Sequence, residues 1–327
     1  MRKIFRISAI VLGALVLLIV CIAVYVKTFL PDVGAAPQMH VLSNPQKIER
    51  GKYLATHVMV CMDCHSQRDW NYFAGPINDT ALGKGGELFD KHLGFPGTIY
   101  SANITPFGIS NWSDGEIFRA ITTGVRKNGK PIFPVMPYNN YRLVDPEDID
   151  DIICYIRSLP AVANKVPESS YDFPMNFIIN TIPQTAHMSA RPDSSDGIAY
   201  GRYLVTAASC GNCHTPFEKG KFDMAFFLAG GRVFDLPGGV ITTPNLTPDR
   251  ATGTGNWTAE MFLNKFRAFR DSSYAHRRID FSKDYATVMP WSVFAGMTDH
   301  DLGAIYQYLQ SLKPISHRNA AFQPHLN

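Results

Sequence analysis

The sequence has little excess charge. Its 31 lysine and arginine residues stand against 28 aspartate and glutamate residues, and neither a basic patch nor an acidic tail is present. This balance argues against a protein that binds nucleic acid through a basic surface. Long runs of alternating apolar and polar residues, which would predict β-strands, are also lacking, as is a βαβ pattern. We therefore expect a mainly α-helical, loop-rich protein.

Cysteine is scarce and unevenly placed. Four of the six cysteines lie in two C-x-x-C-H runs, Cys61-Met-Asp-Cys64-His65 and Cys210-Gly-Asn-Cys213-His214, about 150 residues apart. Two thiols three residues apart on one helical turn can add to the two vinyl groups of a porphyrin, and the next histidine can then bind its iron. The other two cysteines, Cys21 and Cys154, occur in apolar segments, and we expect Cys154 to be a buried free thiol.

Two other interpretations of the C-x-x-C pairs remain open. Both pairs together could hold one zinc ion, or each could form a redox disulfide. A shared zinc site requires the pairs to meet in space, although each lies in its own domain-sized unit, and it leaves His65 and His214 without a role. A thioredoxin-like disulfide requires the missing βαβ context. The sequence therefore favours two covalently bound haem c groups.

The N-terminus contains an uncharged run of 20 residues, 7–26, preceded by Arg2, Lys3 and Arg6. A helix of this length is about 30 Å long and can span a bilayer. The basic flank predicts a cytoplasmic N-terminus with the remainder outside, which in bacteria is the periplasm. A cleaved signal peptide is the alternative, with a weak cleavage site at 33–36, but the apolar run is longer than usual. We expect residues 1–28 to form a transmembrane anchor and 29–45 a tether.

The remaining chain contains two repeats in tandem, 46–165 and 197–318, joined by segment 166–196 and followed by a tail, 319–327. Each repeat has an amphipathic helix, C-x-x-C-H, Asn-x-Thr-Pro, Asn-Trp, Met-Pro-aromatic and a closing amphipathic helix, in that order. Capping residues predict helices that begin at Ser113, Asp145 and Thr298. We expect stretches 73–76 and 228–231, which share Ala-Gly, to correspond, and the apolar link to pack across both repeats.

The haem hypothesis assigns a role to each motif. Cys61, Cys64, Cys210 and Cys213 attach the porphyrins, and His65 and His214 are the proximal ligands. Met136 and Met289 occupy the same place in the two repeats, each before a proline, and are the expected sixth ligands; a thioether raises the reduction potential. His92 and His276 are the fallback ligands. Pro76 is expected to offer its carbonyl to the proximal imidazole. The residues expected to shape the haem pockets are Asn103, Trp112, Tyr138, Asn245, Trp257 and Trp291.

The order of these motifs resembles the class I c-type cytochrome family in a tandem diheme arrangement. The closing helices end in Tyr155-Ile-Arg-Ser-Leu159-Pro160 and Tyr308-Leu-Gln-Ser-Leu312. The Asn-Ile-Thr-Pro and Gly-x-x-Asn-Trp stretches, and Phe173-Pro-Met-Asn-Phe177, are similar to the membrane-bound cytochrome c subunits of periplasmic alcohol and gluconate dehydrogenases. Those subunits typically carry three haem domains, whereas this sequence has two C-x-x-C-H motifs. The resemblance implies His/Met-ligated haem and electron transfer.

We therefore expect a single-pass protein of the bacterial inner membrane with two haem domains facing the periplasm. It would transfer electrons between a periplasmic dehydrogenase or quinol-oxidising respiratory complex and a terminal oxidase or soluble cytochrome. We expect no catalysis by the chain alone and assign no catalytic residue. A haem enzyme, such as a diheme peroxidase or thiosulfate dehydrogenase, is the alternative, and it needs an exchangeable iron position. A haem-based sensor or structural subunit is the third hypothesis.

Overall fold

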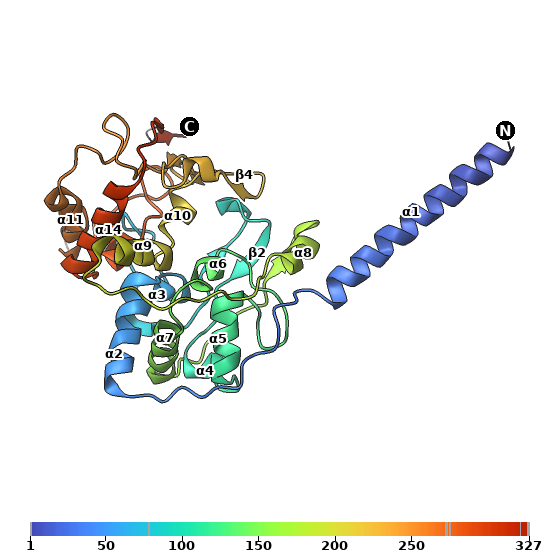
Figure 1. The fold of residues 1–327 in the computed structure, drawn as a ribbon, viewed down its shortest axis with the longest axis horizontal. Helices are drawn as coiled ribbons and strands as arrows, with labels where there is room; N and C mark the ends of the chain where they lie inside the picture. The colour runs from blue at the N-terminus through green and yellow to red at the C-terminus, as the bar shows by residue number, and fades with distance from the viewer. Residues whose placement is uncertain (1, 78, 272–273, 275, 321, 326–327) are drawn as a thin grey trace.

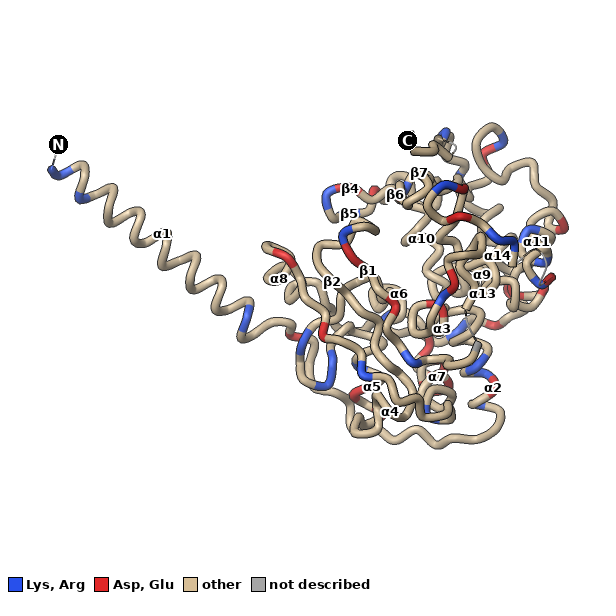
Figure 2. The backbone as a smooth tube through the Cα atoms, turned by 180° about the vertical axis from the view of Figure 1, so that it is seen from behind, with Lys and Arg blue, Asp and Glu red and all other residues tan. Residues whose placement is uncertain are grey.

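A long helix stands apart from the body of the molecule. The computed structural model describes residues 2–77, 79–271, 274, 276–320 and 322–325, so residues 321, 326 and 327 of the expected tail lie outside the described part. Helix α1 (Arg2–Thr28) is exposed along its length, and it is long and apolar enough to cross a membrane, judged by length and composition (Figure 1). Figure 2 shows lysine and arginine at its two ends and none in its middle.

The end of α1 contacts the link between the two repeats. The Lys27 ammonium donates a hydrogen bond of 2.6 Å to the Asn176 carbonyl in helix α8 (Met175–Ile178) and lies 4.7 Å from the centre of the Phe177 ring. The cation therefore has both a carbonyl and an aromatic face as partners. These contacts place the end of α1 beside the link.

The body is mainly helical, and its elements occur in a similar order in the first half (46–165) and the second half (197–318). The first half contains α2 (Pro45–Tyr53), the π-helical turn η1 (Leu54–Val58), α3 (Cys61–His65), η2 (Asp79–Ala81), η3 (Lys91–Leu93), α4 (Pro106–Ile109), α5 (Asp114–Thr123), α6 (Tyr138–Tyr141) and α7 (Pro146–Ser158). The link adds η4 (Ile179–Thr181). The second half contains α9 (Gly197–Ala207), α10 (Cys210–Cys213), η5 (Met224–Phe226), α11 (Ala259–Arg267), η6 (Ala268–Arg270), α13 (Trp291–Phe294) and α14 (Asp299–Ser311).

Short antiparallel strands hold the loops together. Strands β1 (Leu88–Phe89), β2 (Gly97–Tyr100) and β3 (Ser170–Tyr171) pair in that order. A hairpin is formed by β4 (Phe217–Glu218) and β5 (Lys221–Phe222), and a third sheet by β6 (Val233–Leu236), β7 (Gly239–Thr242) and β8 (Gln323–Pro324). The expected mainly helical fold is confirmed. The strands were not predicted, because two to four residues are too few to show a two-residue period.

Side-chain caps fix where the longer helices begin. Ser113 and Glu116 form the predicted capping box of α5, with reciprocal hydrogen bonds of 3.1 and 2.8 Å. Asp145 caps α7 ahead of a proline at the first helical position, and Thr298 caps α14. Each cap satisfies otherwise unpaired amide groups and contributes about 1 kcal/mol. The three predicted helix starts are confirmed.

One continuous apolar core runs through both halves. It forms where α2 packs on α7 and α9 packs on α14, and it includes the isoleucines of α7 and Leu302, Ile305 and Leu309 of α14. Glycine permits both helix crossings. A Cβ atom at Gly51 would lie 1.8 Å from the Asp151 carbonyl oxygen, and one at Gly201 would lie 1.9 Å from that of Ala304. The core also encloses Cys154, which is buried and free as expected.

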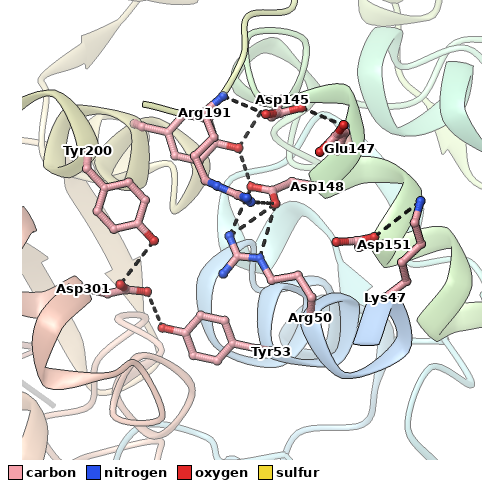
Figure 3. A network of polar contacts seen from close by, with 11 residues as sticks. Lys47, Arg50, Tyr53, Asp145, Glu147, Asp148, Asp151, Arg191, Tyr200 and Asp301 are labelled. Carbon is pink, nitrogen blue, oxygen red and sulfur yellow. Dashed lines mark hydrogen bonds and ion pairs between the residues drawn. The ribbon is translucent and has the colours of Figure 1, made fainter. Parts of the chain in front are cut away.

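Polar side chains cross the junction between the halves at the edge of this core (Figure 3). Asp148 of α7 is almost fully buried and accepts hydrogen bonds from Arg50 of α2, Arg191 of the link and Tyr203 of α9. On the other side of the junction, Asp301 accepts bonds from Tyr53 and Tyr200. A buried carboxylate is tolerated only when it is paired in this way.

The link between the halves, 166–196, is hydrogen-bonded to the first half. Its β3 pairs with β2, the His187 amide donates to the Arg142 carbonyl at 2.9 Å, and Arg191 binds Asp148. These bonds all join the link to the first half. Met188 of the link also packs on the apolar core that both halves share, and Asp196 at its end caps α9 of the second half.

The expected match between stretches 73–76 and 228–231 is wrong. The amides of Gly85 and Gly230 donate to the carbonyls of His65 and His214 respectively, both at 2.8 Å, so the stretch equivalent to 228–231 is 83–86. Residues 71–73 instead pair with the second half. The amide of Phe73 donates to the Arg277 carbonyl at 3.0 Å, and its ring stacks on Phe269. A shared Ala-Gly dipeptide carries too little information to fix a register.

Candidate functional site

The two C-x-x-C-H motifs share an unusual backbone entry. Val60 and Ser209, the residues just before each motif, have φ angles of 48° and 57°, in the left-handed region. Such a conformation is rare for a β-branched residue like valine and costs on the order of 1–3 kcal/mol. The turn directs the short helices α3 and α10, which carry the thiols. The same strained conformation at the same place in both halves indicates a shared local requirement.

The histidine of each motif is held by a backbone carbonyl. Nδ1 of His65 lies 2.7 Å from the Ala102 oxygen, and Nδ1 of His214 lies 3.0 Å from the Pro244 oxygen. A carbonyl can only accept, so Nδ1 carries the hydrogen and Nε2 keeps its lone pair, as a metal-binding imidazole requires. Burial lowers the pKa of both histidines and thus favours their neutral form.

This finding corrects the predicted role of Pro76. Its carbonyl accepts the Asp69 amide at 3.0 Å, whereas the carbonyls that hold the histidines belong to Ala102 and Pro244. Sequence reasoning missed both residues. The available signal was their position, because each directly precedes a repeated Asn-x-Thr-Pro stretch.

The asparagines of those stretches fix the carbonyl-bearing loops. The side-chain oxygen of Asn103 accepts the Thr105 amide at 3.0 Å and its hydroxyl at 2.7 Å, and Asn245 bonds Thr247 in the same way at 2.9 and 2.7 Å. Their amide groups reach the segments after the closing helices, at Val162 and Ile315. Asn103 and Asn245 therefore shape the sites by anchoring these loops.

A cavity of about 2360 Å³ reaches both motifs. A typical small-molecule site has about 300–1,000 Å³, so this cavity has room for more than one ligand. Its wall includes Cys64 of the first motif, Cys210, Cys213 and His214 of the second, and the aromatic residues Trp257, Phe262 and Trp291. Paired thiols, a neutral imidazole and apolar walls fit a covalently attached haem.

The candidate sixth ligands lie in equivalent turns. The carbonyls of Met136 and Met289 accept hydrogen bonds of 2.8 Å from the amides of Tyr138 and Trp291, and both methionines are partly buried against the core. Met289 lines the cavity together with His214, while the neighbours of Met136, Val135 and Pro137, line it in the first half. These positions are compatible with axial ligation.

The remaining predicted residues are placed less centrally. His92 lies on the cavity wall with an exposed side chain, and His276 is exposed with its ring against Tyr72. Trp257 lines the cavity, whereas Trp112 packs on the core and its carbonyl accepts a bond from Arg157. Tyr138 is fully buried, and its ring blocks any side chain at Gly124, where a Cβ atom would come within 2.5 Å.

The two motifs do not form a shared zinc site. In the part of the chain that the structure describes, no three histidine, cysteine, aspartate or glutamate side chains cluster as a metal site requires. Burial raises the pKa of Cys61 and of Cys210 to about 12, so neither thiol is a thiolate at neutral pH. The geometry therefore favours separate attachment of a large apolar group at each motif.

The electrostatic surroundings of the two motifs differ, which the sequence reasoning missed. Burial and Asp63 raise the pKa of Cys64, and Arg68 lowers it. Burial raises the pKa of Cys213, and Arg232 lowers it. Asp63 and Arg68 form an ion pair of 3.1 Å whose side chains are both largely buried. The arginine at the first motif is thus neutralised by Asp63, whereas no carboxylate among the described residues pairs with Arg232 at the second.

Comparison with known proteins identifies the family. Residues 198–313, which contain the second C-x-x-C-H motif, the His214 loop and Met289, match the cytochrome c family. The chain contains a cytochrome c domain. A cytochrome c domain implies covalently bound haem c and a role in electron transport, in agreement with the imidazole geometry and the apolar cavity.

Relatives of this cytochrome extend the match over most of the chain. The cytochrome c subunit of a quinone-dependent alcohol dehydrogenase from Komagataeibacter europaeus is 30% identical over 298 residues, covering 85% of this chain and 58% of the relative. The gluconate 2-dehydrogenase cytochrome c subunit of Pantoea cypripedii is 28% identical, covering 83% and 60%. A diheme c-type cytochrome from Cereibacter sphaeroides is 28% identical, covering 65% and 72%. The chain thus spans only about 60% of the dehydrogenase subunits that it resembles.

Proposed function

We propose that this cytochrome is a membrane-anchored diheme electron carrier with one haem c in each half, 46–165 and 197–318. The observation that carries the proposal is the duplicated histidine geometry. His65 and His214 each follow a C-x-x-C pair, and each binds a carbonyl that precedes an Asn-x-Thr-Pro stretch. The family match covers only the second half, so this equivalence is what supports a haem in the first.

The chain's own residues would hold the two groups in the same way. Cys61 and Cys64 would attach one porphyrin, and Cys210 and Cys213 the other. His65 with Met136, and His214 with Met289, would each offer an imidazole nitrogen and a thioether sulfur to the iron. When bound, haem c provides a one-electron couple. The carbonyls of Ala102 and Pro244 keep each Nε2 aimed at the ligand position, and the apolar walls exclude water.

Helix α1 would anchor this carrier in the bacterial inner membrane, with both haem domains in the periplasm. Its length, its lack of internal charge and the basic residues before it support that orientation. The relatives are named as cytochrome c subunits of an alcohol dehydrogenase and a gluconate 2-dehydrogenase, which supports a dehydrogenase as the donor, and the orientation of α1 would place that donor in the periplasm. A quinol-oxidising complex is an alternative donor, and a terminal oxidase or soluble cytochrome is the acceptor.

The haem count is the decisive test. The full chain, produced in a host that matures c-type cytochromes, should carry two covalent haems by mass spectrometry and keep its colour in acid acetone. The double variants C61A/C64A and C210A/C213A should each lose one haem, while C154A should keep both. One haem in the parent chain, or colour that is extracted by acid acetone, would refute the proposal. Retention in membranes after an alkaline wash tests the anchor separately.

A further inference from the structure

The two halves carry opposite charges at one equivalent backbone position. Glu87 follows the glycine pair 85–86, and Arg232 follows the glycine pair 230–231. The amide of Glu87 binds the Ser101 hydroxyl at 3.0 Å, and that of Arg232 binds the Thr243 hydroxyl at 3.1 Å. Their carbonyls accept the amides of the same two partners, at 3.0 and 2.9 Å. The register is therefore the same, and only the side chain differs.

Both side chains face the cavity. Glu87 accepts a hydrogen bond of 3.1 Å from the Trp70 indole and lines the wall near Cys64. Arg232 donates to the Asn212 carbonyl, and its guanidinium lies 5.1 Å from the Phe217 ring and 5.0 Å from the Phe234 ring. It also lines the wall near Cys213. The arginine is thus held by aromatic faces and a carbonyl.

A second charge difference lies inside the C-x-x-C-H motifs, and it also makes the first half more negative than the second. The residue before the second cysteine is Asp63 in the first half and Asn212 in the second. Asp63 pairs with Arg68, Glu87 adds a second carboxylate, and the charge of Arg126 acts on His65, so the first half has two positive and two negative groups beside its motif. Among the described residues, Arg232 supplies the charge that acts on the second motif. Lys84 and Asp90, half-buried on the wall of the first half, offset each other, and Lys221, Asp235 and Lys265 are exposed and screened by solvent.

We propose that this inversion sets the direction of electron flow, from the first-half haem to the second. The inference rests on the proposed diheme function. Reduction adds one electron to a centre, so a nearby positive charge stabilises the reduced form and a negative charge stabilises the oxidised form. The first-half haem therefore has the lower potential. It takes one electron from the dehydrogenase and passes it to the second-half haem, which reduces the oxidase or soluble cytochrome.

Potentiometric titration of the purified full-length holoprotein tests this inference. The parent protein should show two one-electron transitions. R232Q should shift the redox equilibrium of the second-half haem about tenfold toward the oxidised form. This shift lowers the higher of the two potentials by about 59 mV for one electron. E87Q should raise the lower potential in the same sense. Both variants should therefore reduce the difference between the two potentials, R232Q by lowering the higher one and E87Q by raising the lower one.

Two control variants separate charge from structure. R232K keeps the charge and should retain the higher potential, and K265Q removes an exposed charge from the same wall and should shift neither transition. The inference would be wrong if R232Q and E87Q left both potentials unchanged, or if either variant increased the difference between them. The proposed diheme function would not be affected by that result. A single transition in the parent protein would overturn both.

Discussion

The hydroxyl of Tyr53, in the first helix of the first half, donates a hydrogen bond of 2.6 Å to Asp301, in the last helix of the second half. The reciprocal bond exists as well. Tyr203, in the first helix of the second half, donates at 2.5 Å to Asp148 in the last helix of the first. Each phenol oxygen also accepts the amide of the partner helix's N-cap residue, at 3.2 Å in both cases. The halves therefore exchange equivalent contacts across their junction.

Removing either phenol should loosen this junction. Y53F or Y203F leaves a largely buried carboxylate with one charge-assisted bond fewer, and we expect each change to lower the free energy of unfolding by about 1.5–3 kcal/mol. Denaturant unfolding followed by haem absorbance measures the loss. Y285F, at a half-exposed tyrosine, is the control and should change stability by less than about 0.5 kcal/mol. Equal stability of all three variants would show that the reciprocal bonds are unimportant.

Asp151 should make stability fall as the pH rises. Burial raises the pKa of this carboxyl to about 6, with Lys47 acting against it. The folded protein therefore holds the proton more tightly than the unfolded chain, so the contribution is complete below about pH 3.8 and is lost as the pH rises through about 6. D151N should remove this dependence and be at least as stable as the parent at pH 7. Thermal unfolding between pH 4 and 7 would check it.

Asp114 should make stability depend on pH in the opposite direction to Asp151, and the same experiment can measure it. Although burial acts to raise its pKa, hydrogen bonds from the Val41 amide and Arg157 hold the pKa below its ordinary value. Its contribution is present above about pH 3.8 and is lost as the pH falls. D114N should therefore destabilise the protein at pH 7, where D151N does not. If D114N were as stable as the parent protein at pH 7, the assignment for Asp114 would be wrong.

The proposed axial methionines, Met136 and Met289, should control the potentials of the two haems independently. M136L or M289L removes a thioether that favours the reduced state, so the potential of that haem should fall by at least about 59 mV, a tenfold change in its redox equilibrium. The other haem should stay nearly unchanged. M224L, at an exposed methionine, is the control. Unaltered potentials in M136L and M289L would remove these residues as ligands.

The loop asparagines should affect both stability and ligation. N245A removes the bonds to Thr247 and Ile315 from a buried site, and we expect a loss of about 1–3 kcal/mol in unfolding free energy. Because the loop carries the Pro244 carbonyl, the redox potential or spin state of the second-half haem should also change. N256A, which removes a bond at an exposed site, should change neither. A stable N245A variant with an unshifted spectrum would refute the anchoring role.

Much of the local structure could be predicted because it depends on neighbouring residues. The caps at Ser113, Asp145 and Thr298 and the apolar face of α7 follow from side chains within a few positions of the backbone groups that they serve. The C-x-x-C-H motifs are local in the same sense, since adjacent atoms on one turn perform the chemistry. The mainly helical fold and the haem c hypothesis therefore came from sequence alone.

Other features depended on atoms that are distant along the chain. Ala102 lies 37 residues from His65, and Tyr53 lies 248 residues from Asp301. No periodicity links such partners, so Pro76 was chosen wrongly and the reciprocal tyrosines were missed. The opposition of Glu87 and Arg232 also became visible only when hydrogen bonds fixed the register of the two halves. Helix caps and the C-x-x-C-H turns are determined by residues that are close together in the sequence. The orientation of a distant carbonyl and the charges around a site are determined only when the folded chain brings remote groups together.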